Sequence, residues 1–129
     1  GPDIKAAKVG TFTKVTGISD RTLAEKYLRT SWEALKYLVD EYYPDRVFVG
    51  VGIPYNRAFM SFEELREIGE KIASLDPNLQ VCVLDYRPEF RAHYLKRPSF
   101  EEMLEAKKVL EDAGCKVVIA QTSLGHVGP

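Results

Sequence analysis

Apolar residues along the chain fall into two kinds of pattern, short uninterrupted runs and helical stripes. The clearest run is residues 81–84, which shows no alternation with polar residues. Such a run is typical of a strand buried on both faces, as in a parallel sheet beneath helices. Residues 46–53 and 116–121 also predict strands, because β-branched residues are frequent in them. Residues 3–6 are either a frayed start or the end of a further strand.

Apolar residues spaced by three and four predict helices between these runs. The longest is expected over residues 20–43. Two others follow the repeated segment Ser-Phe-Glu-Glu, which predicts a capping box at residues 61–64 and 99–102 and helices that end near residues 75 and 113. A turn or short helix is expected over residues 11–17, and residues 122–129 are expected to be loop.

This alternation of strands and helices predicts an α/β fold. Right-handed crossovers would make all the strands parallel. About four strands are few for a doubly wound sheet and half of an eight-stranded barrel, so we expect a partial TIM-type barrel, an open half-barrel. Residues 3–129 would form this single domain, and Gly1-Pro2 resembles the remnant of a removed tag.

Composition and charge exclude several classes of protein. A net charge of -1 argues against a general nucleic-acid binder, which needs a basic stripe. No stretch is long and apolar enough for a membrane span, and the polar start shows no secretory signal. Cys82 and Cys115 are expected to be buried reduced thiols in a cytoplasmic protein. His93 and His126 have no partner at metal-ligand spacing, so no metal site is predicted.

Polar residues follow the ends of the predicted strands. Because the carboxyl ends of parallel strands share one edge, where α/β proteins bind ligands, these residues predict a rim site. The rim set is Lys5, Pro54, Tyr55, Asn56, Asp85, Tyr86, Arg87, Glu89, Arg91, Gln121 and Thr122, and Asp3 is an alternative to Asp85 for an amine. Its cations suit a carboxylate or phosphate, its acids suit an amine, and its amides add hydrogen bonds. In the alternative, the arginines and acids of residues 85–91 only pair with one another on the surface.

Several segments in order resemble a known family. Asp3-Ile4-Lys5, then Lys-Val-Thr-Gly at residues 14–17, a long helix and Gly52-Ile53-Pro54 resemble the C-terminal half of radical SAM enzymes of the pyruvate formate-lyase activating type. Residues 86–91, Tyr-Arg-Pro-Glu-Phe-Arg, and residues 95–99 are similar to archaeal members. The resemblance covers nearly the whole chain from Asp3.

The resemblance implies a partial barrel that binds S-adenosylmethionine and a 4Fe-4S cluster. It also implies that S-adenosylmethionine is cleaved reductively to a 5′-deoxyadenosyl radical. Asp3 and Lys5 match residues that contact the methionyl end of the cofactor. Arg87, after Tyr86, stands where glycyl-radical activases often carry histidine near the adenosine or substrate. The expected cofactor-binding residues are therefore Asp3, Lys5, Tyr86 and Arg87. The expected substrate-binding residues are Tyr55, Asn56, Arg91 and Gln121.

The cluster-binding motif C-x-x-x-C-x-x-C of that family is absent from these 129 residues. The sequence therefore predicts a fragment that is inactive alone, has no cofactor bound, and can form a homodimer through an exposed sheet edge. The substrate, a protein or a small molecule, is not indicated. Two alternatives are a non-enzymatic α/β domain that binds a small molecule at the same rim, and a structural half-barrel.

Overall fold

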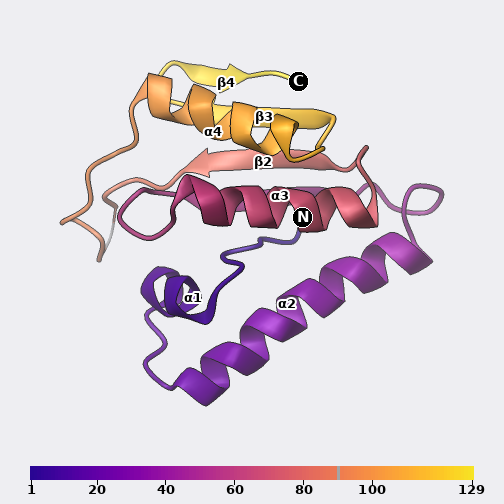
Figure 1. Ribbon diagram of the computed structural model, residues 1–129, viewed down its shortest axis with the longest axis horizontal. Helices are drawn as coiled ribbons and strands as arrows, with labels where there is room; N and C mark the ends of the chain where they lie inside the picture. The colour runs from indigo at the N-terminus through magenta and orange to yellow at the C-terminus, as the bar shows by residue number, and fades with distance from the viewer. Residues whose placement is uncertain (90) are drawn as a thin grey trace.

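The structure is a computed structural model that describes residues 1–89 and 91–129. The described residues form four helices and four strands (Figure 1). In chain order these are α1 (Val9–Thr16), α2 (Arg21–Glu41), β1 (Gly50–Tyr55), α3 (Phe62–Leu75), β2 (Gln80–Asp85), α4 (Phe100–Asp112), β3 (Val117–Thr122) and β4 (Gly125–Val127). The α/β class and the predicted helices are confirmed, with ends within two residues for the long helix α2. In the described part of the chain, no helix is long and apolar enough to cross a membrane.

The strands form one open sheet in the order β1-β2-β3-β4. The first three are parallel, but β4 is antiparallel to β3, so the prediction of a purely parallel sheet is wrong. The expected loop at residues 122–129 instead contains a tight reversal. Thr122 Oγ1 accepts from the Leu124 amide at 3.1 Å and donates to the Gly125 carbonyl at 2.6 Å. Gly125 supplies the left-handed backbone of the turn, at φ 109°.

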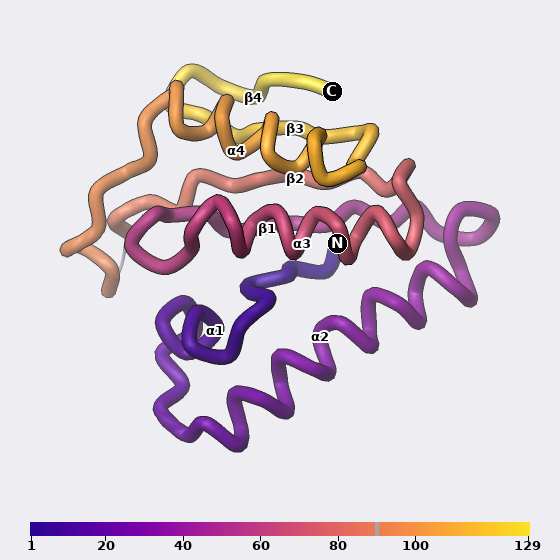
Figure 2. The backbone as a smooth tube through the Cα atoms, viewed as in Figure 1, coloured from indigo at the N-terminus to yellow at the C-terminus, as the bar shows by residue number. Residues whose placement is uncertain are grey.

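The helices cover one face and one edge of the sheet. In Figure 1, α3 and α4 lie side by side in front of the strands, and α4 packs against β3. The backbone trace in Figure 2 places α1 and α2 beyond the β1 edge. There α2 is fixed by Trp32, whose indole Nε1 donates to the Ala6 carbonyl at 3.2 Å.

The other face of the sheet is only partly covered. In β1, β2 and β3 alike, buried residues alternate with partly exposed ones. The prediction that residues 81–84 are buried on both faces is therefore wrong, because Cys82 and Leu84 are partly exposed. The sequence of residues 81–84 does not show this alternation of burial, because the residues on both faces of β2 are apolar there. The partly exposed row that crosses the sheet is Gly52, Cys82 and Ile119. We call this side of the sheet the open face. Whether it curves as a half-barrel stays a prediction.

One predicted strand boundary is also wrong, the start of the strand expected at residues 46–53. Residues 3–6, for which two alternatives were open, pair with the sheet at Asp3 through an isolated parallel bridge to Gly52. Residues 46–49 precede β1 instead of belonging to it, because β1 begins where Gly50 meets the first residue of β2, Gln80. Phe48 in this segment is 69% exposed, and Val47 is also exposed. Strand propensity depends on residue type alone, so it could not show that residues 46–49 pair with no strand among the described residues.

Both predicted serine caps form, but neither glutamate completes a capping box. Ser61 and Ser99 accept hydrogen bonds from the amides of Glu64 and Glu102, each at 3.1 Å. The Glu102 side chain instead pairs with Arg57 at 2.7 Å. The Glu64 side chain turns away to the start of α1 and connects two helices that are far apart in sequence.

Candidate functional site

The parallel strands end at one rim, as predicted, but the rim residues point in two directions. Tyr55, Asp85 and Thr122 are buried among the helices, in register with the core positions of their strands. Alternation of side chains places Leu84 and Gln121 on the open face. The rim is therefore split, and its residues cannot all contact one ligand.

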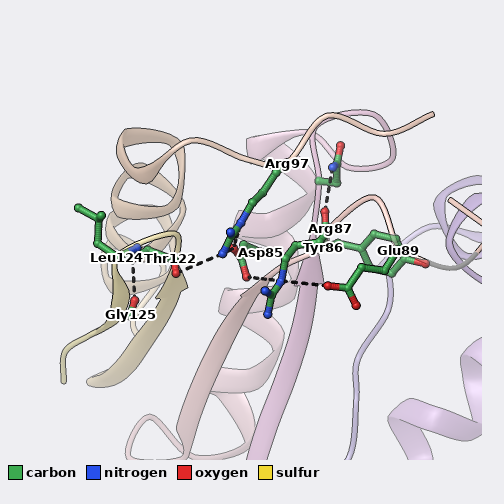
Figure 3. Close-up of polar contacts among 9 residues, drawn as sticks. Asp85, Tyr86, Arg87, Glu89, Arg97, Thr122, Leu124 and Gly125 are labelled. Carbon is green, nitrogen blue, oxygen red and sulfur yellow. Dashed lines mark hydrogen bonds and ion pairs between the residues drawn. The ribbon is translucent and has the colours of Figure 1, made fainter. Parts of the chain in front are cut away.

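Asp85 anchors the chain that leads into α4. Its side chain is fully buried, and its Oδ2 accepts from Arg97 Nε at 2.7 Å and forms an ion pair with Arg97 Nη2 at 2.6 Å. The same guanidinium reaches the Thr122 carbonyl at 3.4 Å (Figure 3). Arg97 thus connects the ends of β2 and β3. Sequence reasoning did not assign it to the rim, because no spacing rule links residue 97 to residue 85.

Arg87 approaches the same carboxylate from another side (Figure 3). Its Nε lies 3.8 Å from Asp85 Oδ1 and 3.9 Å from Glu89 Oε1, and its side chain is 41% exposed. Both distances exceed hydrogen-bond length. Asp85 Oδ1 is buried and makes no hydrogen bond to the described residues. Residues 85, 87 and 89 therefore pair with one another, as in the alternative interpretation. The long distances leave Arg87 free to turn toward a ligand.

Tyr55 and Asn56 serve the fold in this structure. Asn56 is 2% exposed, donates to the carbonyls of Tyr86 (3.1 Å) and Lys96 (2.9 Å), and accepts from the Ala58 amide. Tyr55 stacks on Phe62 with ring centroids 5.4 Å apart. Burial, with a smaller effect of Glu102, raises the pKa of Tyr55 to about 12. Binding of a substrate by these two residues remains a prediction.

Asp3 and Lys5 form an accessible pair beside the open face. Lys5 Nζ lies 3.3 Å from Asp3 Oδ2, and the side chains are 36% and 51% exposed for Lys5 and Asp3 respectively. The Asp3 carboxylate lies over Gly52, where an added Cβ would come within 2.5 Å of Oδ1. Gly52 thus leaves space for this carboxylate, and its backbone holds the segment through hydrogen bonds to Pro2 and Ile4.

Tyr86 and Arg91 line a cavity of about 360 Å³ between the end of α1 and the connection after β2. Tyr86 meets Phe59 edge to face, with ring centroids 5.5 Å apart. Lys14, Glu89 and Tyr94 complete the polar part of the wall. Phe90, which belongs to the motif at residues 86–91, lies outside the described residues. Gln121 lies elsewhere, on β3 opposite His126 of β4.

The cysteines lie in apolar surroundings. Burial raises the pKa of Cys115 to about 11, and its thiol donates to the Gly69 carbonyl at 3.4 Å. Burial also raises the pKa of Cys82, which is partly exposed. Among the residues that the structure describes, no three His, Cys, Asp or Glu side chains are grouped so that they could hold a metal ion.

The fold and the rim define an α/β domain with one open sheet face and a divided polar edge. Comparison with known proteins adds no relative, because no family model, no curated protein and no solved structure matches the chain. Function is therefore inferred from the residues and their geometry.

Proposed function

We propose that this chain is the C-terminal half of a radical SAM enzyme and that its Asp3–Lys5 pair binds the methionyl end of S-adenosylmethionine. The observation that supports this most is the open face. It is apolar and partly exposed, while α3 and α4 cover the opposite face. A barrel divided lengthwise would present its interior in this way, with helices outside and the cofactor residues at the carboxyl ends of the strands.

The residues present fit the amino acid part of this cofactor. The Asp3 carboxylate suits an ammonium group, and the Lys5 ammonium suits a carboxylate. Both are partly exposed, and the absence of a Cβ at Gly52 lets the Asp3 carboxylate lie against β1. S-adenosylmethionine would supply the deoxyadenosyl group for radical chemistry. The chain's own contribution is to bind and orient the molecule.

The described residues do not fit the 4Fe-4S cluster. Such clusters need several thiolates, and the chain has two cysteines, one buried with a raised pKa. In our proposal the cluster ligands come from another part of the parent protein. We derive no redox step from the residues described.

The test is a titration of the chain with S-adenosylmethionine, followed by amide chemical shifts. We expect shifts at residues 3–6 and at Gly52, and their loss in Asp3→Ala and Lys5→Ala. Lys108→Ala is a matched control, because Lys108 is exposed on α4, away from the pair. No response at millimolar ligand, or an unchanged response in Lys5→Ala, would refute the binding role. A parent gene that lacks the three-cysteine motif would refute the enzyme class.

A further inference from the structure

A groove far from the rim separates α2 from α3. Its volume is about 400 Å³, within the range of small-molecule sites. Leu28 and Trp32 of α2, Leu75 of α3 and Ala7 of the first segment form its apolar floor. The rim site and the proposed cofactor pair use none of these side chains.

Trp32 is held in a fixed orientation at this floor. Its Nε1 donates to the Ala6 carbonyl at 3.2 Å, which sets the plane of the ring. Lys71 of α3 extends its Nζ to 4.1 Å from the ring centroid. The Lys71 side chain is exposed and unbranched, so it can swing off the indole without moving the backbone. This movement would uncover an aromatic surface inside the groove.

The charges at the edge of the groove are unequally neutralised. Arg29 pairs with Glu33 at 3.8 Å, and Glu25 pairs with Arg21 at 3.3 Å. Lys36 pairs with Asp40. Lys71 has the indole as its partner and no carboxylate within ion-pair distance among the described residues. The groove therefore combines an apolar floor with one cation that can accept an anionic partner.

We propose that this groove binds a small amphipathic monocarboxylate, with its apolar body on Leu28, Trp32 and Leu75 and its carboxylate on Lys71. The apolar floor provides the attraction for the hydrocarbon part. The lysine selects the charged end, because a neutral or cationic head group gains nothing from it.

The experiment compares three probes of equal length: hexanoate, hexanol and hexylammonium. Trp32 is the only tryptophan, so its indole N–H gives one resolved proton–nitrogen signal in the full chain. We expect hexanoate to shift this signal and to bind about fivefold more tightly than hexanol, the factor expected of a partly screened ion pair. Hexylammonium should bind most weakly.

The variant Lys71→Gln removes the charge and keeps a shorter, unbranched polar side chain. It should make the affinities for hexanoate and hexanol equal. Lys36→Gln is the matched control, since Lys36 lines the same groove from α2 but is paired with Asp40. Equal affinity for all three probes, or unchanged selectivity in Lys71→Gln, would overturn the proposal. So would a Trp32 signal that moves with protein concentration alone, because a second copy of the chain would then be the occupant.

Discussion

Replacing Glu64 should weaken the whole fold, although this residue lies outside the predicted site. Its carboxylate is 3% exposed and accepts from the amides of Ala7 (3.1 Å) and Lys8 (2.9 Å) and from the Thr11 hydroxyl (2.5 Å). The Lys8 side chain provides no cap for α1, and the Glu64 carboxylate instead holds the two amides just before the helix and the Thr11 hydroxyl of its first turn. It also lies at the helix end where the macrodipole favours negative charge.

The expected loss in the free energy of unfolding follows from the three donors that Glu64→Ala would leave without an acceptor. At about 1 kcal/mol for each hydrogen bond, the loss is roughly 3 kcal/mol. Favourable placement at the helix terminus adds up to about 1 kcal/mol. The expected loss of about 3–4 kcal/mol is a large share of the roughly 5–15 kcal/mol that stabilises a typical domain. The variant should still fold, with a much lower urea midpoint.

The assay is urea unfolding followed by far-UV circular dichroism, with hydrogen exchange at the Ala7 and Lys8 amides, which donate to Glu64. Glu63→Ala is the control, because Glu63 is exposed in the same turn and should change stability by no more than about 0.5 kcal/mol. A double-mutant cycle with Thr11→Val should show coupling of about 1 kcal/mol. The reasoning is refuted if Glu64→Ala costs no more than Glu63→Ala.

Two further predictions concern the rim and the core. Arg97→Gln should lower the free energy of unfolding in urea by about 2 kcal/mol, because it leaves the buried Asp85 without its close partner while Arg97 itself is partly exposed. Arg87→Gln removes only a 3.8 Å pair and should cost much less. Equal losses in the two variants would contradict the role of Arg97. Stability should also fall in alkaline solution, because burial raises the pKa of Cys115 from 9.0 to about 11 and that of Tyr55 from 10.0 to about 12. Each group makes its full contribution to the free energy of unfolding below its pKa in the unfolded chain. This contribution disappears as the pH rises through its pKa in the folded protein. The urea midpoint should therefore decline from pH 9 upward, less steeply in Cys115→Ala, and a midpoint independent of pH would contradict the assignment.

Local chemistry made much of the fold predictable. Serine at residues 61 and 99 marked the starts of α3 and α4, and apolar spacing located α2. The failures were tertiary. Strand β4 has three residues and depends on one turn at Gly125. The open face is as apolar as the buried one, so no pattern in the sequence could distinguish a covered face from an exposed one.

The candidate site was predictable as a location but not as an arrangement. The carboxyl ends of β1, β2 and β3 do share one edge, but binding of a ligand by the rim set stays a prediction. Which side each residue faces depends on strand register, and this register buried Tyr55 and Asp85. The partnership of Asp85 with Arg97 depends on the path of the connection after β2, which no local rule determines.

The order of strands in the sheet copies their order in the chain, β1-β2-β3-β4. Each strand after the first therefore joins a neighbour that is already present when the chain is made from its amino end. The loops to be closed span one helix or one turn, which keeps their entropic cost low. Such a sheet can grow one strand and one helix at a time during synthesis. In this order β4 pairs last and covers the outer edge of β3.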